Sequence, residues 1–208
     1  MNRFDKNEVN AVKRVIEGGK NLSGFTSKFR GGDEVQKFEE EFAKYIGVKH
    51  ALSFNSGTMA IFAAFQSIIK HGRREKKWKI ENPKINLPAY TFTADPSAAL
   101  LANGEVNFED IDKKTYCMLP PKKKCHISTP TYLLGNAPEK IDFGNSEFSV
   151  EDCCQALGTT VNGKMVGSFG DMSIFSFQET KHITTLGEGG MLCSNNEELI
   201  QIASAIRN

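Results

Sequence analysis

The chain has 208 residues, of which 39% are hydrophobic and 25% are charged, so its composition is that of a globular protein able to bury one sizeable core. This composition argues against intrinsic disorder. The 26 basic and 25 acidic residues nearly cancel, and therefore no net field favours nucleic acid or an anionic membrane as a partner.

The first predicted element is an amphipathic helix over residues 34–45. Val35, Phe38, Phe42 and Tyr45 recur in it at three- and four-residue intervals, while the opposite face is charged. We expect this helix to pack one face on a core.

Short apolar or β-branched runs follow, and they predict up to seven strands. The runs are residues 51–54, 85–88, 105–109, 126–134, 148–151, 172–176 and 190–194. Stretches compatible with helices, at 58–69 and 93–102, lie between several of them. This alternation predicts an α/β fold, a three-layer α/β/α sandwich around a mostly parallel sheet of about seven strands.

We interpret residues 1–208 as one domain, with residues 1–33 as an N-terminal arm or helix. Residues 71–84 form a polar insertion that we expect on the surface. Ligands of open α/β sheets bind beyond the carboxyl ends of the strands, so candidate residues are sought there.

The cysteines suggest a reducing compartment. They are odd in number, lack the spacing of metal ligands, and include an adjacent pair that is badly placed for bridging: Cys117, Cys125, Cys153, Cys154 and Cys193. The N-terminus has no apolar signal core, and the longest apolar run, residues 59–65, is too short to span a bilayer. These features predict a cytoplasmic protein with no metal site and no membrane partner.

Three segments carry candidate chemistry. Ser56, Gly57 and Thr58 follow a predicted strand and open a helix, where free N–H groups favour an anion such as phosphate, although Ser and Thr are also ordinary helix caps. Asp152 follows an apolar run and could hold a heteroaromatic cation, or it could be a cap or turn residue. Lys181 lies in a loop with clustered glycines, where a desolvated amine could attack a carbonyl.

Six ordered blocks resemble the signature of the DegT/DnrJ/EryC1/StrS family, fold-type I aminotransferases that act on nucleotide-linked keto-sugars. The blocks are residues 55–58, 88–92, 108–112, 151–156, 167–171 and 187–190. The similarity runs from about Gly31 to Asn208 and implies the large domain of an aspartate-aminotransferase-like fold. Residues 176–181 most resemble enzymes that aminate position four of a dTDP-4-keto-6-deoxyhexose.

The resemblance implies pyridoxal 5'-phosphate as the cofactor. Lys181 would bind it as a Schiff base and then transfer the proton. Asp152 would pair with the protonated ring nitrogen, and Gln155 would bond the phenolic oxygen. Phe92 would stack on the ring, although core packing is the alternative for a phenylalanine.

The remaining cofactor contacts implied by the resemblance are those of the phosphate group, which Ser56, Gly57, Thr58 and Ser176 would hold. The implied donor is glutamate, the acceptor is a nucleotide-linked 4-keto-6-deoxy sugar, and the enzyme is a homodimer. Because the dehydratase branch of the family carries histidine in place of the lysine, Lys181 argues against that branch.

The chain also departs from the pattern. The resemblance implies a chain nearly twice as long, and we expect the family's small C-terminal domain to be absent from these 208 residues. Two connections, residues 118–124 and 136–147, look too short for helical crossovers, so we expect loops and a thinly covered sheet face. Tyr132 replaces an expected histidine and Asp95-Pro96 interrupts a small, uncharged stretch; we expect neither to touch the cofactor set.

Two alternatives stay open beside an aminotransferase that is active as a dimer. One is a catalytically incomplete remnant of the cofactor-binding fold that acts as a binding or assembly subunit, or that requires a separate C-terminal chain. The other is a doubly wound nucleotide-binding domain, for which no Gly-x-Gly-x-x-Gly follows a first strand.

Overall fold

The structure, a computed structural model, describes residues 4–19 and 31–208. Contacts between Cα atoms divide the chain into two units, residues 1–38 with Asn208 and residues 39–207. The described part of the predicted arm contains α1 (Lys6–Glu17), which begins at a capping box formed by Asp5 and Glu8. Residues 1–3 and 20–30 of that arm lie outside the described residues. Within the described ranges, no helix has the length and apolar character needed to cross a membrane.

Helix α2 (Asp33–Ile46) is the amphipathic helix predicted over residues 34–45. In its second half, the Phe42 ring packs edge to face on Phe175 and Phe177, with ring centroids 5.0 and 5.4 Å apart. The predicted core contact is thereby confirmed for the part of α2 that belongs to the second unit.

All seven predicted strands form one sheet, in the order β1-β9-β8-β5-β4-β2-β3. Their bounds are β1 (His50–Phe54), β2 (Lys84–Pro88), β3 (Glu105–Glu109), β4 (Cys125–Ser128), β5 (Ser146–Asp152), β8 (Met172–Ser176) and β9 (Gly190–Ser194). Strands β3, β2, β4, β5 and β8 are parallel, whereas β9 is antiparallel to both β8 and β1. The prediction of a mostly parallel α/β sheet is confirmed. The strand predicted at 126–134 ends early, before Pro130, and a short 3-10 helix (Leu133–Gly135) follows.

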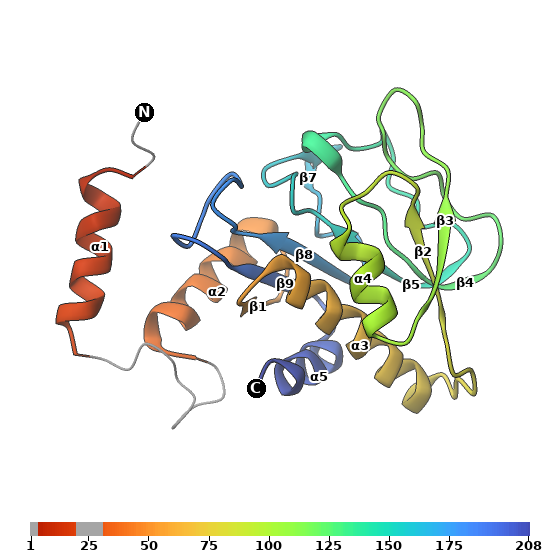
Figure 1. The fold of residues 1–208 in the computed structure, drawn as a ribbon, viewed down its shortest axis with the longest axis horizontal. Helices are drawn as coiled ribbons and strands as arrows, with labels where there is room; N and C mark the ends of the chain where they lie inside the picture. Colours follow the sequence, from red (N-terminus) through yellow and green to blue (C-terminus); the bar gives the residue numbers. More distant parts are fainter. Residues whose placement is uncertain (1–3, 20–30) are drawn as a thin grey trace. The chain divides into compact units, whose positions relative to one another are not determined.

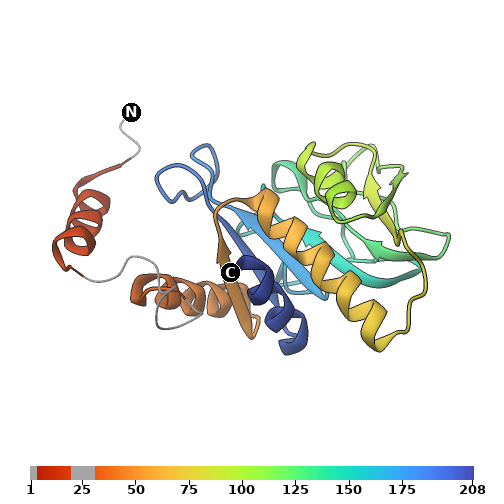
Figure 2. The ribbon, with the colours of Figure 1, turned by 60° about the horizontal axis from the view of Figure 1, so that its bottom comes forward.

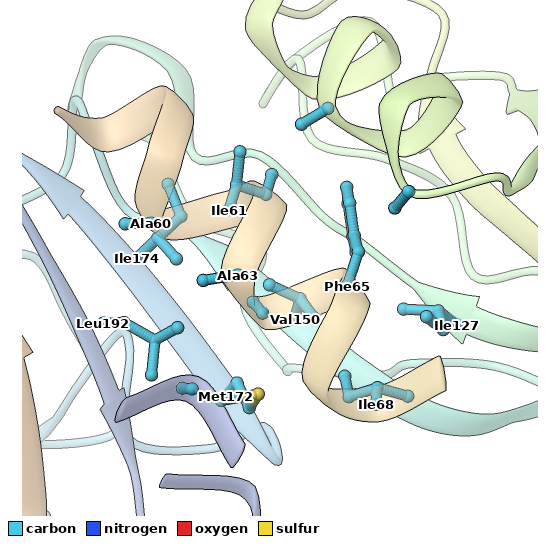
Figure 3. Packing of buried hydrophobic residues seen from close by; sticks show 14 of the residues in the cluster. Ala60, Ile61, Ala63, Phe65, Ile68, Ile127, Val150, Met172, Ile174 and Leu192 are labelled. Atoms are coloured by element: carbon cyan, nitrogen blue, oxygen red, sulfur yellow. The ribbon is translucent and has the colours of Figure 1, made fainter. Parts of the chain in front are cut away.

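Three helices cover one face of this sheet: α3 (Gly57–Glu75), α4 (Ala94–Leu101) and α5 (Glu197–Arg207). Figures 1 and 2 show α3 and α5 side by side across the strands. Apolar side chains of α3 fill the space against the sheet, with Phe65 packed among Ile127, Val150 and neighbouring residues in Figure 3. Burial of this stripe explains why an alanine- and isoleucine-rich segment folds as a central helix.

The prediction that residues 71–84 form a surface insertion is wrong at its beginning. Helix α3 continues to Glu75, and His71 is buried. A Cβ atom on Gly72 would lie 2.5 Å from the Trp78 ring, so the glycine lets the chain fold back closely after the helix. The first residues of the predicted insertion are therefore part of α3 and pack against the rest of the domain.

The opposite sheet face is covered by residues 39–46 of α2 and by the segment after β5. Phe175, which points away from α3, packs on α2, and the segment carries the two-stranded hairpin of β6 (Thr160–Val161) and β7 (Lys164–Met165). Residues 118–124 and 136–145 contain no helix, as the short connections predicted. Cover over β5 and β8 on this face therefore comes from loops more than from crossover helices.

Candidate functional site

One cavity of about 450 Å³ lies where strands β5 and β8 end and α3 begins. All eight residues predicted from the sequence to bind or attack a cofactor line it: Ser56, Gly57, Thr58, Phe92, Asp152, Gln155, Ser176 and Lys181. Asp152 and Ser176 are the last residues of β5 and β8. The cavity thus occupies the strand ends at which the parallel sheet predicted a ligand.

The first N–H groups of α3 open onto this cavity. Ser56 caps the helix, since its Oγ accepts the Met59 N–H at 3.1 Å, and the N–H groups of the first turn have no partners within a helix. A Cβ atom on Gly57 would lie 3.0 Å from the Ser176 Cβ and 3.2 Å from the Cys154 Sγ. Glycine therefore brings the helix terminus against the end of β8, and two serines flank a ready anion site.

Asp152 and Gln155 form the acidic and amide part of the cavity. Asp152 is 4% exposed, and its Oδ1 accepts the Cys154 N–H at 2.8 Å. The Gln155 Oε1 accepts the Leu134 N–H at 3.0 Å, which directs the amide nitrogen to be the donor for a ligand. The pair can therefore accept from a cationic group and donate to an anionic oxygen.

Lys181 is in a loop that its own hydrogen bonds shape. Its N–H donates to the Gln178 carbonyl at 2.8 Å, and the Thr180 N–H and hydroxyl both donate to the Gln178 side chain. The Lys181 Nζ lies 6.0 Å from the centre of the Phe92 ring. The predicted glycine-bounded loop is thus a turned segment that holds an amine in the cavity.

Phe92 is not a core residue. Its side chain is 61% exposed although it lines the cavity, so the core-packing alternative is wrong for this residue. A ring in this position presents an apolar face to a ligand and to solvent.

Asp95 overturns the expectation that the Asp95-Pro96 interruption stays clear of the cofactor set. Asp95 lines the cavity, is 1% exposed, and lies within hydrogen-bonding reach of the Asp152 carboxyl. Burial, together with the charge of Asp152, raises the pKa of Asp95 well above its ordinary value. Tyr132 also lies close, because its N–H donates to the Asp152 carbonyl at 3.0 Å.

Sequence reasoning missed several other residues that line the cavity, among them Asp95, Thr131 and Cys154. An acidic residue within the otherwise apolar segment 94–101 was the available signal for Asp95. Thr131 and Cys154 carried no local signal, since they reach the cavity only because their strands end there. Burial raises the pKa of the Cys154 thiol well above its ordinary value, so this thiol stays neutral.

The arrangement brings together an anion cradle, a carboxylate, an amide donor, an aromatic face and a primary amine. Such a set can bind a phosphorylated heteroaromatic ring and present an amine to a carbonyl group. Among the described residues, no group of three or more His, Cys, Asp or Glu side chains could hold a metal ion.

Comparison with known proteins agrees with the resemblance in sequence. The model of the DegT/DnrJ/EryC1/StrS aminotransferase family matches residues 3–132 and 146–208. A UDP-4-amino-4,6-dideoxy-N-acetyl-beta-L-altrosamine transaminase of Campylobacter jejuni is 36% identical over 99% of this chain and 53% of its own length. A GDP-4-keto-6-deoxy-D-mannose 3-dehydratase of Yersinia pseudotuberculosis is 31% identical over 98% of this chain and 52% of its own.

Solved structures share the fold. The aminotransferase from Psychrobacter cryohalolentis superposes with a TM-score of 0.78 at 25% identity, over 98% of this chain and 51% of that one. An E. coli GDP-4-keto-6-deoxy-D-mannose-3-dehydratase with bound hydrated PLP gives a TM-score of 0.80 at 25% identity, over 97% and 52%. The chain spans about half the length of the relatives it matches. It belongs to the DegT/DnrJ/EryC1/StrS aminotransferase family.

Proposed function

We propose that the chain is the cofactor-binding part of a pyridoxal-phosphate-dependent aminotransferase. It moves an amino group from glutamate to a nucleotide-linked 4-keto-6-deoxy sugar. The observation that carries the proposal is that the Lys181 amine, the Asp152 carboxylate and the anion cradle at Ser56 line one cavity.

The residues fit the cofactor group by group. The start of α3, with Ser56, Gly57 and Ser176, suits a phosphate because N–H groups and hydroxyls converge there. Asp152 suits a protonated ring nitrogen, and the amide nitrogen of Gln155 suits a phenolic oxygen.

Bound pyridoxal phosphate supplies an electron sink for the carbon that loses a proton. The chain's own residues would orient the cofactor ring and move the proton. Phe92 would offer an apolar face to the ring, and the Lys181 Nζ would take and return the proton at the reacting carbon. The loop bonds around Gln178 hold the backbone of Lys181 during this exchange.

Transfer of an amino group is favoured over dehydration because residue 181 is a lysine, which can bind the cofactor covalently. The acceptor class follows from relatives whose names specify UDP- or GDP-linked sugars. The proposal includes a second copy of the chain, or a separate chain, because Phe92 lines the cavity and is still 61% exposed.

The test is spectroscopic. Purified protein with added pyridoxal phosphate should show the visible absorbance of the lysine-bound cofactor, and Lys181→Ala should abolish it. Lys44→Ala, which removes an exposed lysine of α2, is the matched control and should keep the band. A wild-type chain without the band would refute cofactor binding.

Glutamate tests the transferase part separately. Added to the loaded protein, it should remove the visible band and yield one equivalent of 2-oxoglutarate. A loaded protein that leaves glutamate unchanged would contradict the aminotransferase assignment and leave cofactor binding intact.

A further inference from the structure

Asp95 is a second buried carboxyl in the cavity, and two threonine hydroxyls donate to it. Its Oδ2 accepts the hydroxyl of Thr131 at 3.0 Å and a short hydrogen bond from the Thr91 hydroxyl. The Asp152 carboxyl lines the same cavity, within hydrogen-bonding reach of Asp95. Asp95 therefore joins the segment after β2 to the ends of β4 and β5.

Two carboxyl groups can share a hydrogen bond only if one of them carries a proton, since an ionised carboxylate has no donor. The titratable groups that face Asp95 from the cavity walls are Asp152, Cys154, Lys181 and Glu188. Burial first, and then the charge of Asp152, raise the pKa of Asp95 well above its ordinary value, so Asp95 is the carboxyl that holds the proton. Both Thr hydroxyls donate to one oxygen of Asp95, so its other oxygen is the one that carries a proton toward Asp152.

We propose that Asp95 is a positioning residue of the cofactor site, a neutral acid that donates its proton to Asp152 and holds that carboxylate toward the ring nitrogen of the cofactor. The inference rests on the proposed function and deepens it. In this arrangement the Asp152 carboxylate is the negative charge that meets the ligand. The hydrogen bond from Asp95 stops the Asp152 side chain from rotating within the cavity.

The arrangement has a chemical consequence for the site. A charged Asp95 would place two negative charges beside one ring nitrogen and would repel Asp152. A neutral Asp95 leaves a single anion of fixed orientation, which is the partner a single pyridinium N–H requires. Thr91 and Thr131 fix Asp95 in turn, since both of their hydroxyls donate to its Oδ2.

Two variants separate this role from simple packing. Asp95→Asn keeps an oxygen for the two threonines and an N–H donor for Asp152, so it mimics the protonated acid at every pH. Asp95→Leu fills a similar volume without a donor. We expect the Kd for pyridoxal phosphate to stay within about threefold in Asp95→Asn and to rise roughly 10- to 100-fold in Asp95→Leu, the loss of one hydrogen bond to a charged group.

Infrared spectroscopy is a second test, which needs neither the cofactor nor a folded Asp95→Leu variant. The infrared spectrum of the wild-type chain at pH 7 should contain the carbonyl stretch of a protonated carboxyl, and this band should be missing from Asp95→Asn. A wild-type spectrum identical to that of Asp95→Asn would overturn the inference. Equal binding of the cofactor by the asparagine and leucine variants would also overturn it.

The two proposals fail in different ways. A wild-type chain that shows the infrared band but binds no pyridoxal phosphate refutes the proposed function, and the positioning role falls with it. A chain that binds the cofactor but lacks the band refutes only the role of Asp95.

Discussion

Glu151 and Asp152 are neighbours at the end of β5, both almost fully buried, yet their surroundings are opposite. Successive side chains of a strand point to opposite faces. Glu151 accepts the N–H groups of Gly167, Phe169 and Gly170 at 2.7 to 2.9 Å and the Tyr132 hydroxyl at 3.1 Å. Asp152 faces the cavity and accepts one backbone N–H.

The difference shows why one buried carboxylate stabilises the fold whereas its neighbour can bind a ligand. The Glu151 carboxylate accepts hydrogen bonds from the loop over residues 167–170 and so fixes that loop to the end of β5. Gly167 in that loop has a φ of +90°, and a Cβ atom there would lie 2.5 Å from the Phe175 ring, so the close approach requires glycine. Asp152 keeps acceptor positions for a ligand.

The largest expected effect is on stability, from Glu151→Ala. Removal of the carboxylate leaves the buried Gly167 N–H, two half-buried N–H groups and the buried Tyr132 hydroxyl without this acceptor, so the free energy of unfolding should fall by roughly 3–5 kcal/mol. Urea denaturation of the apo-protein measures it. Glu151→Gln, which keeps one oxygen, should lose less. A loss below about 1 kcal/mol would break the comparison, because Glu151 would then not hold the loop.

The next effect is on binding, from Asp152→Ala. We expect the Kd for pyridoxal phosphate to rise roughly 10- to 100-fold, since a charged hydrogen bond contributes about 1.5–3 kcal/mol. The free energy of unfolding should change less than in Glu151→Ala. Titration of the visible band and urea denaturation, run on both alanine variants, measure the contrast. A larger stability loss in Asp152→Ala than in Glu151→Ala would reverse the assignment.

A smaller effect concerns pH and the carboxyl beside Asp152. Because burial raises the pKa of Asp95 above its ordinary value of 3.8, the folded chain holds a proton that the unfolded chain has released. The free energy of unfolding of the wild type should therefore fall relative to Asp95→Asn as pH rises, by at most about 1.4 kcal/mol per pH unit. The difference should become constant above the folded-state pKa.

Denaturation of the wild type and Asp95→Asn from pH 4 upward measures that slope. A difference that does not vary with pH would show that Asp95 has the same pKa in both states, against the burial seen in the structure.

The smallest effect is expected for Tyr132→Phe. The hydroxyl is one of four donors to Glu151, and three N–H groups remain, so the free energy of unfolding should fall by roughly 1 kcal/mol. Burial and the charge of Glu151 raise the pKa of Tyr132, so the loss should be the same from pH 6 to 9. Cofactor affinity should not change, and a weakened affinity would mean that Glu151 and Asp152 act as one unit.

Most of the fold could be predicted because its signals are local. Each β-branched or apolar run became a strand within a few residues, and the capped turn at Ser56 began α3 as expected. The end of β4 was missed although Pro130, inside the predicted run, is a local signal against a continuous strand. The length of α3 was missed because the Gly72–Trp78 contact forms only when the chain folds.

By itself, the sequence determined the family, the sheet and the eight lining residues, because ordered motifs at strand ends are a property of the chain. Only the tertiary structure decided that Asp95 meets Asp152, that Phe92 is exposed, and that Glu151 is saturated while its neighbour is not. These facts depend on which strand ends lie side by side and on the sheet face to which each side chain points. Distances between residues remote in sequence arise from packing, and no local pattern contains them.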